Sequence, residues 1–241
     1  ASAPLCACRC RQGDPAADTY RSLDVLDIHY YAEPGLFWNE NADVDTNRRR
    51  IASVRSLWDP TYTEDSWIGE LRPECLHGQP NGRQLQLIPR MRRLIQDHYF
   101  PECELGITEY NWGLRNHIVG AICQADVLGA FGKYDLFIGT RWARLLKDSA
   151  AYNAFKIYGN YDGRKNGHFS RFGDLSIHAQ SSETNRLTVY ASKDSETGAV
   201  KLMVINKEPV SKIATTIRVA GFQAWPEARH FVMDRTNTTR V

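Results

Sequence analysis

Three segments that resemble buried β-strands alternate with amphipathic helical segments along most of the chain. The strand-like segments are residues 23–31, 104–109 and 135–140, and the helical patterns are residues 88–98, 118–132 and 150–158. Strands that alternate with helices form parallel sheets with crossover helices. The nearly continuous apolar run of the first segment predicts a strand that is buried on both faces. We therefore expect an α/β fold here.

A long loop, residues 32–83, separates the first strand-like segment from its helix. Its aromatic residues stand among Asn, Asp, Pro and Arg, and a short helix is expected at 46–57. Loops of this length within a compact domain usually carry a function.

From about residue 186 the apolar residues recur with period two. Strands are expected at 187–191, 200–204, 213–219 and 228–233, with a hairpin loop at 193–198. This pattern predicts an antiparallel, sandwich-like β module. The chain is then expected to comprise an atypical segment (1–17), a partial barrel (18–165), a linker (166–183) and the β module (184–241).

Polar and aromatic side chains gather where the three strand-like segments end. They are His29, Tyr30 and Tyr31, then Glu109, Tyr110, Asn111 and Trp112, then Arg141 and Trp142. Ligands of parallel α/β folds bind at this edge, and no G-x-G-x-x-G or P-loop indicates a nucleotide. A carboxylate beside an amide and an indole suits sugar cleavage, because these groups attack an anomeric carbon, bond hydroxyls and stack on a pyranose. An edge-strand Glu facing solvent is the alternative that this segment alone leaves open.

The composition is that of an ordinary globular chain and argues against nucleic acid or membrane partners. The chain has 241 residues, a net charge of +2 and 42% hydrophobic residues. No apolar run reaches membrane-spanning length, and the short Arg clusters are typical of solvated helix faces.

The cysteines and the first residues give no metal or targeting signal. Cys6, Cys8 and Cys10 lack a second Cys or His pair at finger spacing, and the scattered Cys75, Cys103 and Cys123 are expected to be buried thiols. Residues 1–17 have no apolar segment of a signal peptide, so we expect a disordered tail or misread sequence there.

Several stretches, in order along the chain, resemble the C-terminal half of the catalytic module of glycoside hydrolase family 44 endoglucanases. They are LDVLDIHYY (23–31), RSLWDPTYTEDSWI (55–68), QLIPRM (86–91), LGITEYNWG (105–113), QADVLGAFG (124–132), RW (141–142), AYNAFKIYGNYDG (151–163), VYASKD (189–194) and LMVINK (202–207).

The resemblance implies a retaining endo-β-1,4-glucanase that cuts cellulose-like glucans or xyloglucan. Secretion is expected from this substrate, because a polymer cannot enter the cell. Its fold would be a (β/α)8 TIM barrel, of which this chain holds the sixth to eighth strands, with a β-sandwich. Glu109 would be the nucleophile, and a hydroxyl of Tyr30 or Tyr31 would stabilise its charge. Trp142 would floor the subsite of the scissile sugar, and Trp58, Tyr62 and Trp67 would line the groove. No cofactor is required, although family members can bind a structural calcium, whose ligands the resemblance does not place. A monomer is expected where the barrel is full-length.

One departure from the family pattern is large. The family's acid/base Glu lies in an Asn-Glu-Pro run on the fourth strand, and this chain has no such run. Asn39-Glu40-Asn41 lies in a loop and is a poor substitute. Only three of the eight barrel strands are visible, so we expect a truncated chain. Its sixth strand would keep an unpaired edge, so the chain alone should be weakly stable and have little or no activity. A carbohydrate-binding remnant and a β-1,4-xylanase or mannanase are the alternatives. Asn237-Thr238-Thr239 fits a glycosylation sequon.

Overall fold

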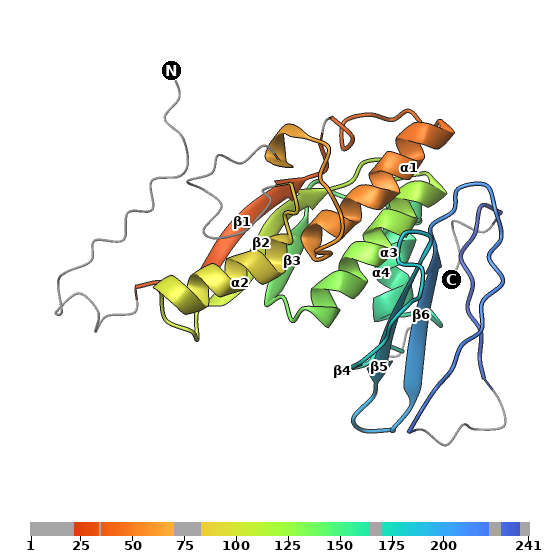
Figure 1. Cartoon of the computed structure of the whole chain (residues 1–241). Coiled ribbons are helices and arrows are strands. Elements are labelled where there is room, and N and C mark those ends of the chain that lie inside the picture. Colours follow the sequence, from red (N-terminus) through yellow and green to blue (C-terminus); the bar gives the residue numbers. More distant parts are fainter. Residues whose placement is uncertain (1–21, 34, 70–82, 164–169, 222–227, 237–241) are drawn as a thin grey trace, which may run out of the picture. The chain divides into compact units, whose positions relative to one another are not determined.

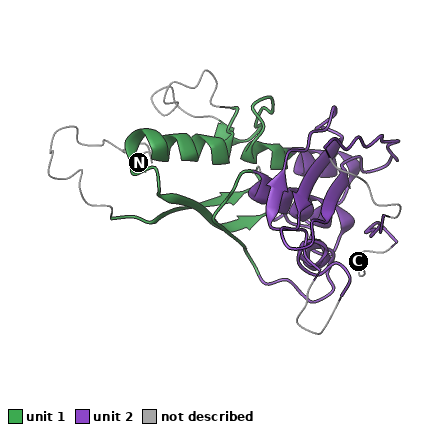
Figure 2. Ribbon diagram, turned by 90° about the horizontal axis from the view of Figure 1, so that it is seen from below, with its two compact units in different colours: residues 1–37, 53–111, 134–143 green, residues 38–52, 112–133, 144–241 purple. Residues whose placement is uncertain are grey.

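The computed structural model describes residues 22–33, 35–69, 83–163, 170–221 and 228–236. The segment 1–17, with its cysteines, Cys75 and the sequon at 237–239 lie outside these ranges. The chain divides into two compact units that interleave along the sequence. Unit 1 is Ala1–Phe37, Ser53–Asn111 and Tyr134–Ala143, and unit 2 is Trp38–Ala52, Trp112–Lys133 and Arg144–Val241 (Figure 2).

Unit 1 is built on a parallel sheet, as the alternation of strands and helices predicts. The strands are β1 (Val25–Tyr31), β2 (Glu104–Asn111) and β3 (Ile138–Arg141), in the order β1-β2-β3 (Figure 1). The third strand begins later than residue 135, where it was expected. Asp135 has a φ of 53°, a left-handed conformation that a strand cannot include.

Helix α2 (Leu87–His98) lies along this sheet and contacts β2 (Figure 1). Pro89 occupies its first turn, where a missing N–H has no consequence. Ile88 and Ile95 are on its buried face, and the Tyr99 N–H donates to the Ile95 carbonyl (2.8 Å) where the helix ends. The expected short helix of the long loop is present as α1 (Val44–Ser53) followed by the 3₁₀ turns η2 (Val54–Leu57) and η3 (Trp67–Gly69).

The prediction that the first strand is buried on both faces is wrong. Along β1, Asp27 and His29 are exposed, whereas Tyr30 is 4% exposed. On β2, Leu105 and Ile107 are fully buried on the same side as Tyr30. The sheet therefore has one covered face and one open face, and the open face carries the polar residues.

Unit 2, which also contains most of α1, packs two further helices with an antiparallel sheet. The helices are α3 (Ile118–Lys133) and α4 (Ala150–Gly159), and the strands are β4 (Leu175–Ile177), β5 (Leu187–Lys193) and β6 (Val200–Asn206), in the order β4-β5-β6 (Figure 1). Gly129 lets this sheet approach α3, because a Cβ there would lie 2.2 Å from the Tyr190 ring. The β5–β6 hairpin turns at Gly198 (φ 71°), within the predicted loop.

Two strand predictions for the β module are wrong. Residues 213–219 and 228–233 form no strand, although their sequence alternates. Ile217 and Val219 are more than half exposed, so within the described residues no neighbouring strand covers the apolar side of this segment. The segment 166–183, expected as a linker, contains the short strand β4, which pairs with β5.

A buried ion pair joins α3 to the sheet of unit 2. Lys207 Nζ lies 3.0 Å from Asp126 Oδ2, and the two side chains are 0% and 1% exposed. The hydroxyls of Thr188 and Tyr190 each donate to Asp126 Oδ1 at 2.7 Å. A buried carboxylate with a cation and two donors fixes one arrangement of helix and sheet, because any other would leave charges without partners.

Candidate active site

Strand β2 has one residue, Thr108, inserted into its pairing with the neighbouring strands. This extra residue determines on which face of the sheet Glu109 lies. Ile107 pairs with Ile28 and Glu109 with His29, so Thr108 has no partner on β1. Ile107 and Tyr110 pair with Gly139 and Arg141 of β3, so two residues again stand opposite one. Such a β-bulge shifts the alternation of side chains by one position. Ile107 and Tyr110 are both buried, and Glu109 belongs to the open face.

Two side chains of β1 contact the Glu109 carboxylate on this open face. The Tyr31 hydroxyl donates to Glu109 Oε2 at 2.8 Å, and His29 Nδ1 lies 3.2 Å from the same oxygen. The Glu109 side chain is 30% exposed. The pKa of Tyr31 is raised to about 12. The largest cause is burial of the phenol, followed by its hydrogen bond to Glu109 and the charge of that carboxylate. Tyr31 therefore remains a neutral donor, which holds Glu109 in place and leaves it accessible.

An amide and an indole complete the strand-end group. Arg141 Nη2 donates to Asn111 Oδ1 at 2.6 Å. Directly after β3, the backbone N–H of Trp142 donates to the Tyr110 carbonyl at 3.0 Å. The Trp142–Ala143 peptide is cis. The Trp142 side chain is 53% exposed, so its indole face is available for stacking on a sugar ring.

Three of the predicted site residues are core residues. Tyr30 is buried and its hydroxyl donates to the buried Glu64 at 3.2 Å. Tyr110 and Trp112 are 1% and 3% exposed. We therefore assign Tyr31, and not Tyr30, as the tyrosine that stabilises the charge of Glu109.

The aromatic residues of the long loop are in different environments. Trp58 is half-buried and its ring stacks on Tyr134 at 6.0 Å, while the Arg55 guanidinium lies 5.2 Å from the Tyr62 ring. Trp67 is 69% exposed. Of these three, Trp67 is therefore the one with most of its surface available to a ligand.

Sequence reasoning missed the side chains that hold this part of the loop. Arg55 Nε donates to Asp59 Oδ2 at 2.7 Å, and both side chains are buried. Burial alone would raise the pKa of Asp59, but hydrogen bonds from Thr61 and Arg55 outweigh it and lower that pKa. The Arg55 to Asp59 spacing is an i, i+4 pair, a signal that was present in the sequence.

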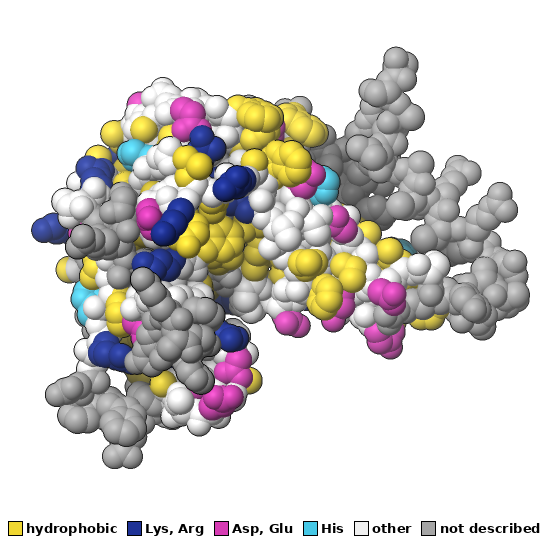
Figure 3. All heavy atoms as spheres, turned by 180° about the vertical axis from the view of Figure 1, so that it is seen from behind, with side chains coloured by type: hydrophobic (Ala, Val, Ile, Leu, Met, Phe, Trp, Pro, Cys, Tyr) yellow, Lys and Arg dark blue, Asp and Glu magenta, His cyan; other side chains and the backbone are white. Residues whose placement is uncertain are grey.

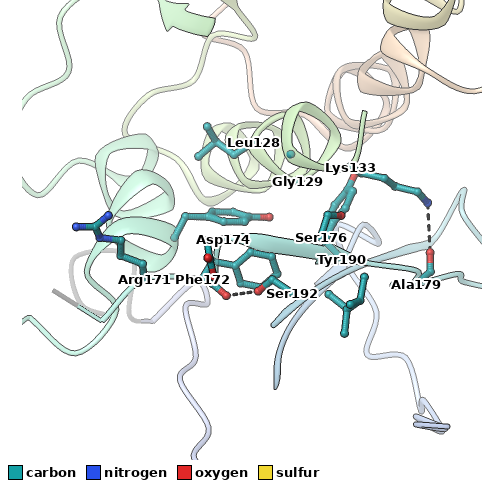
Figure 4. A pocket seen from close by; sticks show the side chains of 15 residues that line it. Leu128, Gly129, Lys133, Arg171, Phe172, Asp174, Ser176, Ala179, Tyr190 and Ser192 are labelled. Carbon is teal, nitrogen blue, oxygen red and sulfur yellow. Dashed lines mark hydrogen bonds between the residues drawn. The ribbon is translucent and has the colours of Figure 1, made fainter. Parts of the chain in front are cut away.

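Unit 2 contains a hollow of about 340 Å³ between α3 and the β4–β5 strands (Figure 4). Three of the polar groups along it bond to protein: Lys133 Nζ donates to the Ala179 carbonyl (3.2 Å), Ser192 Oγ to the Phe172 carbonyl, and the Tyr158 hydroxyl to the Ala125 carbonyl (2.9 Å). This hollow therefore offers less chemistry than the open face of unit 1.

Metal, membrane and charge features add no second site. Across the described residues, no group of three or more His, Cys, Asp or Glu could hold a metal ion, and no helix is long and apolar enough to cross a membrane. Cys103 and Cys123 are buried free thiols, as predicted. On the face seen in Figure 3, Lys and Arg side chains lie among Asp, Glu and hydrophobic side chains.

A carboxylate at the end of a parallel strand, held by a phenol and an imidazole and flanked by an exposed indole, is typical of α/β enzymes that cleave sugars. No family model matches the chain. Endoglucanase A of Paenibacillus lautus is 37% identical over 226 residues, which cover 90% of this chain and 30% of that protein.

Solved structures agree with this relative. A bifunctional glucanase-xylanase from a metagenome library has a TM-score of 0.67 at 38% identity, covering 77% of this chain and 32% of that chain. A Paenibacillus polymyxa xyloglucanase from glycoside hydrolase family 44 has a TM-score of 0.64 at 37% identity, covering 76% and 34%. The chain therefore matches a part of the family 44 glycoside hydrolases, as its sequence predicts, and spans about a third of the length of these relatives.

Proposed function

We propose that this chain is part of a retaining glycoside hydrolase, an endo-β-1,4-glucanase that acts on cellulose-like glucans or xyloglucan, with Glu109 as its nucleophile. The observation that carries this proposal is the position of Glu109. Its carboxylate lies on the open face of a parallel sheet, bonded by Tyr31 at 2.8 Å and faced by His29 at 3.2 Å. On this proposal β1, β2 and β3 are the sixth to eighth strands of a (β/α)8 barrel.

The chemistry assigns a role to each of these side chains. Glu109 attacks the anomeric carbon, the glycosidic oxygen leaves with a proton, and water then hydrolyses the glycosyl ester. Tyr31 and His29 keep the attacking oxygen aimed at the anomeric carbon, which shortens the search for a reactive geometry. Asn111 and Arg141 bond sugar hydroxyls, and Trp142 and Trp67 stack on pyranose rings.

Retention needs a second carboxyl group roughly 5–5.5 Å from the nucleophile, which protonates the leaving oxygen. We do not assign that acid/base group to this chain, because the Asn-Glu-Pro run that carries it in the family is absent from the sequence. Glu40 belongs to unit 2, in an irregular segment before α1. The chain alone is therefore expected to turn over little or no unactivated polymer.

The relatives support the substrate class and one alternative. The P. polymyxa relative is a xyloglucanase, and the metagenome relative acts as a glucanase and a xylanase. A further relative, from Caldicellulosiruptor saccharolyticus, is a β-mannanase/endoglucanase. A β-1,4-xylan or β-mannan is therefore the second candidate substrate. We further propose an extracellular enzyme, because a polysaccharide cannot enter the cell, and a monomer where the full-length barrel is present. It needs no cofactor, and any calcium would be structural.

The nucleophile can be tested without the acid/base group. In 2,4-dinitrophenyl 2-deoxy-2-fluoro-β-cellobioside, the phenolate leaves without a proton and the fluorine slows hydrolysis of the ester. Glu109 Oε then bonds to the anomeric carbon as dinitrophenolate departs. Mass spectrometry of a digest should find the sugar on the peptide that contains Glu109.

Two variants make this labelling decisive. Glu109→Gln should remain unlabelled, and Glu102→Gln, which changes an exposed carboxylate just before β2, should label like the wild type. Label on another carboxylate would remove Glu109 from the role of nucleophile. Binding of cellobioside without label would favour a carbohydrate-binding remnant. The corresponding xylobioside and mannobioside reagents, compared at equal concentration, separate the substrate candidates.

A further inference from the structure

The bulge that places Glu109 is held by side chains of both neighbouring strands. Asp27 of β1 accepts from the Thr108 N–H at Oδ1 (3.0 Å) and from the Thr108 hydroxyl at Oδ2. On the other side, the Thr140 hydroxyl of β3 donates to the Thr108 carbonyl. The backbone groups of the extra residue, which the ladder cannot pair, thus receive side-chain partners.

The period of β2 shows what this arrangement achieves. Leu105 and Ile107 are fully buried, and regular alternation would direct residue 109 to the same covered face. Because Thr108 is the extra residue, Glu109 pairs with His29 and shares its open face. The bulge thus shifts the alternation of β2 from Glu109 onward and directs the Glu109 side chain to the open face.

We propose that Asp27 is a positioning residue for Glu109. By holding Thr108 as the extra residue of β2, Asp27 keeps the Glu109 carboxylate on the face that carries His29 and Tyr31. Its catalytic consequence rests on the proposed function, whereas the positioning itself does not.

A route through His29 is less well supported by the geometry. Asp27 Oδ2 lies 3.8 Å from His29 Nε2, which is too long for a hydrogen bond. Both Asp27 oxygens are instead bonded to Thr108. Asp27 therefore acts through the backbone of β2, and its effect should depend on its ability to accept hydrogen bonds more than on its charge.

The titration of Tyr31 in the full chain reports the position of Glu109 directly. We would follow the ¹³Cζ signal of labelled tyrosine, assigned with Tyr31→Phe. Wild-type Tyr31 should titrate at about 12, partly because of Glu109, and Glu109→Gln should lower this pKa toward the ordinary value of 10.0. Asp27→Ala should lower the pKa by as much as Glu109→Gln, because the carboxylate has moved away.

Conservative changes separate position from charge. Asp27→Asn lacks the charge but keeps an acceptor for the Thr108 N–H and gains a donor for its hydroxyl, so Tyr31 should titrate as in the wild type. Asp97→Ala, which removes an exposed carboxylate of α2, should also have no effect. Tyr30 reports whether unit 1 remains folded. In the folded protein its pKa is well above 10.0, because the phenol is buried and lies beside Glu64. A wild-type Tyr31 titration in folded Asp27→Ala would overturn the proposal.

A second pair covers the case in which Asp27→Ala unfolds. Thr108→Val loses only the hydroxyl contact and should lower the pKa of Tyr31, whereas Thr108→Ser should preserve it; equal titrations of the two would overturn the proposal. The fluorocellobioside distinguishes positioning from function. Asp27→Ala should label about 100-fold more slowly than Asp27→Asn. If Tyr31 responds as expected but no protein labels, the proposed function fails and the positioning role stands.

Discussion

Two carboxylates of this molecule have almost the same partners and very different surroundings. Glu109 in unit 1 accepts from the Tyr31 hydroxyl at 2.8 Å and faces His29 at 3.2 Å. Asp126 in unit 2 accepts from the Tyr190 hydroxyl at 2.7 Å and faces Lys207 at 3.0 Å. The Glu109 side chain is 30% exposed, and that of Asp126 is 1% exposed.

On the proposed function, this difference in burial separates a reactive carboxylate from a structural one. Asp126 is closed to any ligand, and its attraction to Lys207 is strong because water does not screen it. Removing either partner would leave a buried charge alone. Glu109 is held by one phenol and one imidazole at an open face, where a sugar can reach it. Similar donors thus hold a buried carboxylate in one unit and an accessible carboxylate in the other.

The same chemical change in both carboxylates should have very different effects on stability. Asp126→Asn leaves the fully buried Lys207 ammonium without a counter-charge, which costs about 3–5 kcal/mol. Glu109→Gln removes a carboxylate from an open face and should change the free energy of unfolding by less than about 0.5 kcal/mol. Urea unfolding followed by circular dichroism measures both values.

The double variant Asp126→Asn/Lys207→Met tests the cause of the larger loss. Because it removes the lone charge as well, it should recover part of the stability that Asp126→Asn loses. If Asp126→Asn is no less stable than Glu109→Gln, the contrast between a structural and a reactive carboxylate does not hold.

The two tyrosines that bond these carboxylates should also differ. Tyr190→Phe leaves a buried carboxylate with one donor fewer and should cost about 1–3 kcal/mol of unfolding free energy. Tyr31→Phe should cost about 1 kcal/mol or less, but it should slow labelling of Glu109 by about 100-fold, because the attacking oxygen loses its orientation. Urea unfolding and the rate of labelling are measured on both variants. Tyr190→Phe should mainly lower stability, and Tyr31→Phe should mainly slow labelling. A labelling rate of Tyr31→Phe equal to that of the wild type would exclude a role for Tyr31 in aiming Glu109.

Much of this architecture is predictable from the sequence. Regions with strong periodicity, such as helix α2 with Pro89 in its first turn and the β5–β6 hairpin, are close to their predicted positions. The stretches that resemble family 44 predict the relationship that the structural comparison finds. In these regions the interactions that determine the secondary structure are local or repeat along one element.

The face of the sheet on which Glu109 lies could not be predicted from periodicity. Leu105 and Ile107 set a period that directs residue 109 to the covered face, and the bulge at Thr108 depends on Asp27, which is 81 residues away. The same shift decides which of Tyr30 and Tyr31 reaches the carboxylate. Contacts across strands determine these positions, and a single-strand pattern does not contain them.

Alternation alone also overpredicted the β module. Residues 213–219 alternate as β5 and β6 do, yet β5 and β6 pair with each other and this segment forms no strand. A strand needs a partner as well as a pattern, and the sequence does not name the partner.

A third carboxylate, Asp194, is 28% exposed, much as Glu109 is, and should show the smallest effect. The Thr197 hydroxyl, the Thr197 N–H and Lys201 lower its pKa from 3.8 to about 2. Because the folded-state pKa is the lower one, this stabilisation is complete above pH 3.8 and is lost as the pH falls toward 2. Asp194→Asn should therefore reduce the acid sensitivity of urea unfolding in this window, and Glu196→Gln, in the same loop, should not. An unchanged slope in Asp194→Asn would show that the hydrogen bonds of this partly exposed carboxylate contribute nothing measurable, and that burial separates Asp126 from the other two.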